Sequence, residues 1–411
     1  MLFDEIVEET IAMSNVGISK SFWAMLKETS LTFSFGLGGL FAGIMIASQL
    51  GIFSLSPWVI TLYPIVISAK GVGSGLLSGR LSTGLHLGTI HPSFFGNTKS
   101  FYKLIESLLV LTLVTSVTIC AISLFFGTLF WGITLADFPA ILAVVVATMA
   151  LGLLLSFVTI KVSFISFERG LDPDVVVYPI MSTVADVFIT LCYIAVLNLF
   201  FIGALGQWTI GLACLVPVFL VFYILSKNLH EAEFVKTLKE SMVTMLLVSL
   251  LVNVTGTLLL GISNFVAERV EIWTIYTALI GMIGNVGSVV GSTATTKLAL
   301  GLLTPSFSSM RKHAKTIFSA WSASIIMFVI LAVLSLSIHN LFSVSSFYSL
   351  ISIVIVANVL AVATIVVLSY AVSILTFKRG LDPDNFVIPV ESSLADSVTS
   401  IALFVALLLL V

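Results

Sequence analysis

One stretch of this chain occurs twice, and this duplication limits the possible folds more than any other feature. The segment Phe167-Glu-Arg-Gly-Leu-Asp-Pro-Asp174 returns as Phe377-Lys-Arg-Gly-Leu-Asp-Pro-Asp384. Over the twenty positions from Phe167 to Asp186, twelve are identical to the residues 210 positions later, against roughly one or two expected from ordinary residue usage. The chain is therefore predicted to contain two copies of one structural unit.

The surroundings of these two units follow from the composition. Hydrophobic residues make up 59% of the chain and charged residues 9%, and the mean hydropathy is +1.19. Such a chain has too few polar residues to cover a water-exposed surface, and its apolar runs are long enough to cross about 30 Å of hydrocarbon. The runs are continuous and do not alternate, which favours helices over a transmembrane barrel. We predict an all-α polytopic membrane protein.

The apolar runs divide the chain into two groups of five spans with one extra span between them. The eleven expected spans are 31–55, 58–88, 104–132, 139–165, 177–204, 207–226, 242–264, 272–303, 317–337, 348–375 and 387–411. The expected parts are a short amphipathic N-terminal segment at 1–30, a five-helix repeat at 31–204, a linker helix and loop at 205–240, and a second five-helix repeat at 241–411. Because five helices plus one return the chain to its starting side, the repeats should be parallel, related by an axis along the membrane normal.

The positions of lysine and arginine predict the orientation of the chain. If the N-terminus is cytoplasmic, the basic residues of the loops and span ends fall inside, and only Arg269 falls outside. The expected external loops 133–138 and 338–347 contain no lysine or arginine. The positive-inside rule therefore predicts a multi-pass protein of the cell membrane with a cytoplasmic N-terminus and an extracellular C-terminus. The acidic stretch 1–13 does not resemble a cleaved signal peptide.

Charge and cysteine usage exclude several classes of partner. The formal net charge is −2 and no long basic run lies outside the spans, so a nucleic acid is not an expected partner. Three cysteines lie inside apolar segments, at Cys120, Cys192 and Cys214. Buried cysteines of this kind are typical small hydrophobic residues and do not indicate disulfides or a thiolate metal site. The expected partners are the lipid bilayer and, from the residues discussed next, divalent cations, with no cofactor.

Each copy carries one aspartate deep in its last span, Asp186 in the first and Asp396 in the second. A charged group about 10 Å along a membrane helix is costly unless it faces water, a partner or an ion. Hydroxyl side chains that can orient each acid lie three or four residues before it, at Ser182, Thr183, Ser392 and Ser393. Two carboxylates brought together by pseudo-symmetry would repel each other unless a cation lay between them. We predict a divalent cation site.

Other polar residues near the duplicated motif leave two interpretations open. The repeated turn contains four aspartates, Asp172, Asp174, Asp382 and Asp384. They fit a helix end, a turn and a new helix start with a capping aspartate and a proline in the first turn. They also fit a cation site at the cytoplasmic mouth. The second copy adds Glu391, and its glycine-rich second span contains Asn285, which favours either close helix packing or a polar pathway.

These motifs resemble the membrane domain of MgtE-type magnesium transporters, and the tandem arrangement is similar to their duplicated solute-carrier relatives in animals. The resemblance covers about residues 26–204 and 238–411. It implies a five-helix unit paired with a second copy around a central pore, with the two deep acids in the ion pathway. Asn285 corresponds to Val72 or Gly71 in the first copy, so any pore is only pseudo-symmetric.

The ligand chemistry favours a hard cation, most directly Mg²⁺, because the deep polar groups are carboxylates and hydroxyls. Transport of Zn²⁺ or Cu⁺ would favour a deep histidine and cysteine cluster, which the sequence lacks. Two other classes stay open, a proton- or sodium-coupled transporter of another solute and an intramembrane aspartyl protease. The sequences around Asp186 and Asp396 do not resemble the motifs of such proteases, so no enzyme activity is expected. One chain supplies both halves, which predicts a functional monomer.

Overall fold

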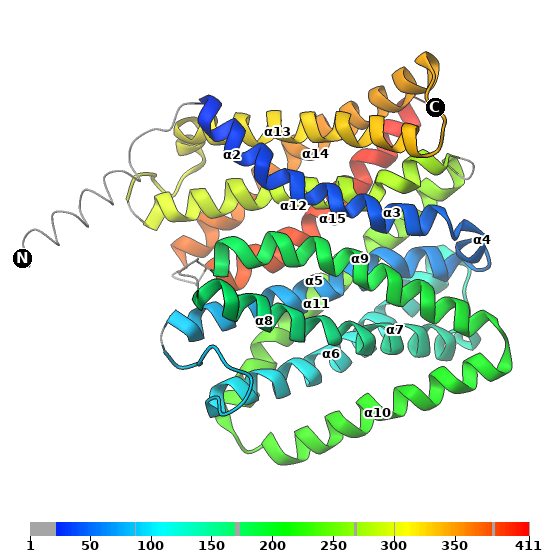
Figure 1. Cartoon of the computed structure of the whole chain (residues 1–411), viewed down its shortest axis with the longest axis vertical. Helices are drawn as coiled ribbons and strands as arrows, with labels where there is room; N and C mark the ends of the chain where they lie inside the picture. Colours follow the sequence, from blue (N-terminus) through cyan, green and yellow to red (C-terminus); the bar gives the residue numbers. More distant parts are fainter. Residues whose placement is uncertain are drawn as a thin grey trace, which may run out of the picture.

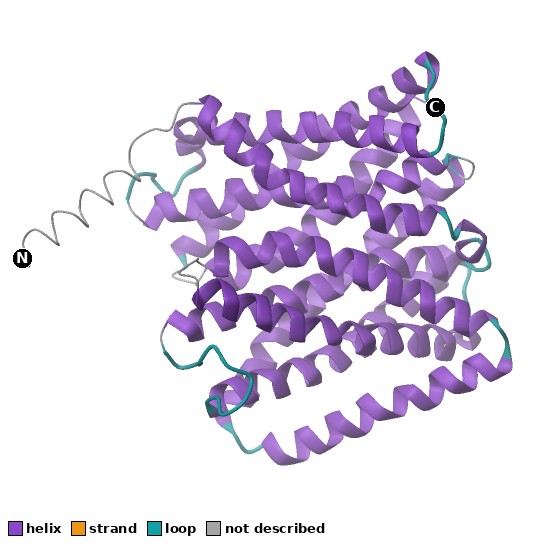
Figure 2. Cartoon of the chain, viewed as in Figure 1, coloured by secondary structure: helices purple, strands orange, loops and turns teal. Residues whose placement is uncertain are grey.

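The computed structural model describes residues 22–86, 88–168, 173–266, 269–299, 301–379 and 383–410. Within these ranges all regular structure is helical and no strand occurs (Figure 2). Ten helical segments of the described chain are long and apolar enough to cross a membrane. The expected all-α polytopic membrane fold is confirmed.

The first half and the linker hold α2 to α10. Their bounds are α2 Phe22–Ser34, η1 Phe35–Gly38, α3 Gly39–Ala47, α4 Leu50–Phe53, α5 Pro57–His86, α6 Lys99–Phe126, η2 Gly127–Trp131, η3 Leu135–Asp137, α7 Phe138–Gly152, α8 Leu154–Glu168, α9 Pro173–Phe201 and α10 Ala204–Asn228. The expected span 58–88 corresponds to α5, whose 30 residues rise far enough to cross a bilayer at about 1.5 Å per residue.

The second half holds α11 to α15. Their bounds are α11 Ala232–Phe265, α12 Val270–Ala299, η4 Phe307–Ser309, α13 Met310–Ile338, α14 Val344–Lys378 and α15 Pro383–Leu410. The helices that carry the deep acids, α9 and α15, both begin at a proline. This matches the preference of proline for the first helical position, where its missing N–H is not needed.

Two expected spans of the first half are broken. The span expected at 31–55 begins earlier, at Phe22, and is divided by the 3₁₀ segment η1 into α2 and α3. The span expected at 139–165 is divided at Leu153, whose N–H is shared between the carbonyls of Met149 and Ala150. The equivalent helices of the second half, α11 and α14, run unbroken for 34 and 35 residues.

The first helix of each half packs on the other half. The α2–α3 segment contacts α13 and α12 of the second half, while α11 contacts α5 and α6 of the first half. The backbones meet at two equivalent points 213 residues apart. A Cβ atom on Gly43 would lie 1.7 Å from the Thr274 carbonyl oxygen, and one on Gly256 would lie 2.3 Å from that of Thr61. The two halves therefore interlock through equivalent contacts of their first helices.

The linker helix α10 lies at the edge of the bundle, where it packs on α6, α7 and α9 of the first half (Figure 1). Its end is held by a polar cluster. The Asn228 side chain is fully buried and donates to Glu106 on α6 at 2.9 Å, and Lys103 donates to its amide oxygen. Lys103 also pairs with Glu106 and with Glu231, which precedes α11, at 3.2 Å each. This cluster ties the linker to both halves.

The described chain begins and ends at opposite ends of the helix bundle, with the start of α2 at the left of Figure 1 and the end of α15 at the right. The loops before α6 and α13 lie at the same end as the start of α2. The assignment of that end to the cytoplasm stays a prediction.

Candidate functional site

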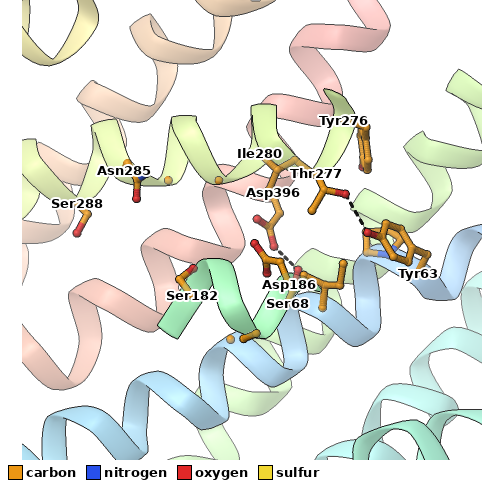
Figure 3. A pocket seen from close by; sticks show the side chains of 16 residues that line it. Tyr63, Ser68, Ser182, Asp186, Tyr276, Thr277, Ile280, Asn285, Ser288 and Asp396 are labelled. Atoms are coloured by element: carbon orange, nitrogen blue, oxygen red, sulfur yellow. Dashed lines mark hydrogen bonds between the residues drawn. The ribbon is translucent and has the colours of Figure 1, made fainter. Parts of the chain in front are cut away.

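A pocket lies between the two halves, built by α5 and α9 of the first and by α12 and α15 of the second (Figure 3). The space open to the centres of water molecules is about 60 Å³, and one water needs roughly 10–15 Å³ on this measure. The pocket therefore has room for several waters. Its lining residues are Tyr63, Pro64, Ile67, Ser68, Gly71, Ser182, Ala185, Asp186, Tyr276, Thr277, Ile280, Gly281, Gly284, Asn285, Ser288 and Asp396.

The two deep acids meet in this pocket. Asp186 from α9 and Asp396 from α15 point their carboxyl groups into the same space (Figure 3), and Asp396 is only 7% exposed. Two carboxylates in one enclosed space repel each other, and a cation between them removes that repulsion. The Ser68 hydroxyl donates to Asp396 Oδ2. The residue 213 positions after Ser68 is Gly281, which also lines the pocket but has no hydroxyl.

A pair of buried tyrosines lines one end of the pocket. The hydroxyl of Tyr63 lies 3.0 Å from that of Thr190, and the hydroxyl of Tyr276 lies 2.8 Å from that of Ser400. The two hydroxyl partners in turn donate to the backbone carbonyls one turn before them, which belong to Asp186 at 2.6 Å and Asp396 at 2.9 Å. The same hydrogen-bonded unit is thus built once in each half, beside each acid.

Sequence reasoning missed these tyrosines. Tyr63 and Tyr276 lie 213 residues apart in equivalent helices, outside the conspicuous repeated motif. The available signal was the presence of a tyrosine at the equivalent position of both copies. A buried tyrosine hydroxyl needs a hydrogen-bond partner, so such a repeated tyrosine indicates a polar site inside the bundle. Ser68 left no comparable signal, since the second copy has glycine at its position.

The residues expected beside the acids fall into three groups. Ser182 and Asn285 line the pocket. Thr183 instead faces η1, where a Cβ on Gly38 would lie 2.6 Å from its methyl group, and Ser393 is fully buried in α15 away from the lining. The remaining predictions lie outside the described residues, which exclude Asp172, Asp382 and the side chains of Asp174, Asp384, Glu391 and Ser392.

The lysine in this region does not line the pocket. Lys70 on α5 is buried, with 3% of its surface exposed. Its Nζ lies 3.4 Å from Ser156 Oγ on α8, and its side-chain carbons run beside the position of Gly152. The positive charge is therefore directed into the first half.

The polar groups that line the pocket are oxygen donors of the kind that hard cations bind. They comprise two carboxylates, the hydroxyls of serine, threonine and tyrosine, and the side-chain amide of Asn285. Carboxylate, hydroxyl and carbonyl oxygens suit Mg²⁺ and Ca²⁺, whereas zinc and copper favour nitrogen and sulfur. In the described part of the chain, no three histidine, cysteine, aspartate or glutamate side chains gather at one point.

Comparison with known proteins connects this geometry to a family. Two stretches of the chain, residues 63–196 and 276–406, match the family described as MgtE, divalent cation transporter. The chain belongs to the MgtE family. Each matched stretch begins at one of the paired tyrosines, Tyr63 or Tyr276, and contains one of the deep acids. The resemblance inferred from the motifs is confirmed, and the family is one of transporters.

This MgtE-family chain also resembles a duplicated animal protein. It is 24% identical to solute carrier family 41 member 3 of Mus musculus, over 90% of this chain and 81% of that protein. No solved structure matches the chain at a significant level. The family and the ten apolar helices found in the described residues together make this a multi-pass membrane protein of a divalent cation transporter family.

Proposed function

We propose that this protein carries Mg²⁺ across the membrane along a pathway between its two halves, with Asp186 and Asp396 as the central cation-binding groups. The observation that carries the proposal is the convergence of these two carboxylates, one from each half, in a single pocket lined by further oxygen donors (Figure 3). A divalent cation neutralises both carboxylates at once, which no monovalent ion does.

The size and chemistry of the pocket support a partly hydrated ion. Mg²⁺ gives up its waters reluctantly and is usually held by one or two carboxylates together with several waters. The pocket has room for several waters, and Ser182, Asn285 and Ser288 offer polar groups to them. The ion is the transported substrate, and the proposed mechanism needs no cofactor.

The lining residues also suggest the course of the pathway. Along α12 the lining runs from Tyr276 to Ser288. The tyrosine pair lies toward the end where α12 begins, and Asn285 and Ser288 lie toward its C-terminal end. With the N-terminus in the cytoplasm, as the basic residues predict, the end of the pocket with Asn285 and Ser288 faces the cytoplasm. Because one chain supplies all four pocket helices, we propose that the monomer is the transporting unit.

The direct test uses purified protein in liposomes that contain a magnesium-sensitive dye. Addition of external Mg²⁺ should raise the dye signal above that of protein-free liposomes, and Mg²⁺ should be carried in preference to Zn²⁺. Imposed sodium and proton gradients distinguish conduction from coupled exchange. If Mg²⁺ did not enter while another solute moved with a proton or sodium gradient, the proposal would be wrong.

A further inference from the structure

The two halves of the pocket differ at the level of the acids. Ser68 on α5 donates a hydrogen bond to Asp396 on α15, so a residue of the first half holds the acid of the second (Figure 3). The residue equivalent to Ser68 in the second half, 213 positions later, is Gly281 on α12, which lines the same pocket as Asp186 on α9. Glycine has no hydroxyl to donate. The two equivalent acids, Asp186 and Asp396, therefore differ in the hydroxyl groups around them.

A donated hydroxyl changes what a carboxylate can do. It occupies a lone pair on one carboxylate oxygen and fixes the orientation of the group. A cation that approaches must share that oxygen with the hydroxyl or use the other one. No side-chain hydrogen bond to the Asp186 carboxylate is found among the described residues, and Asp186 lines the pocket. As far as the described side chains are concerned, its two oxygens are available to a cation or to the waters around it.

We propose that Ser68 is a positioning residue that makes the two acids inequivalent, so that Asp186 supplies the direct contact to the cation and Asp396 a fixed, hydrogen-bonded charge. This inference rests on the proposed function and deepens it. In a transporter assembled from two identical copies, both acids would have the same neighbours. In this duplicated chain, one half has a serine where the other has a glycine.

The chain permits an exchange of the two positions. A Cβ atom built on Gly281 meets nothing within 4 Å, so Gly281→Ser is accommodated, and the pseudo-symmetry places its hydroxyl toward Asp186. Combining Gly281→Ser with Ser68→Ala moves the hydroxyl from one acid to the other while the number of hydroxyls in the pocket stays the same. Asp186→Asn and Asp396→Asn are then compared in the parent and in this exchanged background.

Two readouts apply to every variant. One is the Mg²⁺ concentration that gives half-maximal uptake into liposomes, and the other is the Mg²⁺ concentration that raises the melting temperature of the purified protein, which reports binding without transport. A hydrogen bond to a charged group changes an equilibrium constant by about tenfold or more. In the parent, Asp186→Asn should therefore weaken Mg²⁺ binding about tenfold more than Asp396→Asn, and in the exchanged background the order should reverse.

Single variants keep the test decisive if the double exchange does not fold. Ser68→Ala alone and Gly281→Ser alone should each make Asp186→Asn and Asp396→Asn weaken Mg²⁺ binding to a similar extent. In the first variant neither acid has a hydroxyl donor, and in the second variant both do. Gly284→Ser adds a hydroxyl elsewhere on the α12 lining and should leave the parental order unchanged. An unchanged order in all backgrounds, or equal effects in the parent, would overturn the role of Ser68 but leave the proposed function standing. Parental binding and uptake in both acid variants would overturn the proposed function as well.

Discussion

The hydroxyl groups of Tyr63 and Thr277 lie 2.8 Å apart, although the two residues belong to different halves of the chain (Figure 3). This hydrogen bond crosses the interface at the tyrosine end of the pocket. The pseudo-symmetric contact would join Tyr276 to Pro64, which has no hydroxyl, and Tyr276 is bonded instead to Ser400 of its own half. Tyr63 therefore joins the two halves by a hydrogen bond, whereas Tyr276 is hydrogen-bonded within its own half.

This difference predicts which tyrosine couples the halves energetically. Tyr63→Phe and Thr277→Val remove the same hydrogen bond, so their destabilising effects should be non-additive by about 1 kcal/mol in a double-mutant cycle. Tyr276→Phe combined with Thr277→Val should be additive, because those two hydroxyls are not paired. Thermal unfolding of the purified protein in detergent measures both cycles. Additive effects in the first cycle would show that the cross-half bond contributes nothing to stability.

The close helix crossings predict two sensitive glycines. Gly43→Ala and Gly256→Ala would each drive a methyl group into a carbonyl oxygen of the other half, which should lower the free energy of unfolding by about 1–3 kcal/mol or more. Gly211 on α10 is the matched control, because a Cβ atom there meets nothing within 4 Å and alanine is the better helix former. Gly211→Ala should leave the melting temperature unchanged or slightly raised. A melting temperature for Gly43→Ala equal to that of the Gly211 variant would contradict the observed crossing.

Adjacent hydroxyls before Asp186 should differ in their effect on transport. Ser182 lines the pocket, whereas Thr183 faces Gly38 on η1. Ser182→Ala should raise the Mg²⁺ concentration for half-maximal uptake several-fold by removing a partner for the hydrated ion, and Thr183→Val should act mainly on stability. Uptake and melting temperature measured side by side separate the two effects. If Thr183→Val weakened uptake and Ser182→Ala lowered only the melting temperature, the pathway would lie on the other face of α9.

The cluster at the end of the linker helix predicts a stability effect at a distance from the pocket. Asn228 is fully buried, donates to Glu106 and accepts from Lys103. Asn228→Ala would leave both partners incompletely bonded, which should cost about 1–3 kcal/mol of unfolding free energy. Lys227→Ala removes a more exposed ion pair to the same glutamate and should cost under about 1 kcal/mol. Equal melting temperatures for the two variants would show that α10 is not held through this cluster.

The duplicated motif and the apolar runs were sufficient to predict the helical membrane fold and the family. Those features depend on composition and on repetition, which one sequence displays. The exchange of first helices between the halves was not predictable, because apolar periodicity does not say which neighbour a helix contacts. Thr183 and Ser182 are adjacent hydroxyls in the sequence, and only the rotation of α9 separates their surroundings. The hydrogen bond from Ser68 to Asp396 was not predictable, because the equivalent position of the second copy, 213 residues later, is a glycine.

Mg²⁺ uptake by liposomes containing Asp186→Asn or Asp396→Asn, compared with the parent at equal protein content, measures whether the two acids bind the transported ion. Each substitution keeps the size of the side chain and removes one of the two charges that the pocket offers a divalent ion, and charge interactions in a partly dehydrated site are worth a few kcal/mol. Each variant is expected to fold correctly and to lose most of its uptake at low Mg²⁺. Parental uptake by both variants across the full range of Mg²⁺ concentrations would show that the two acids do not form the cation site.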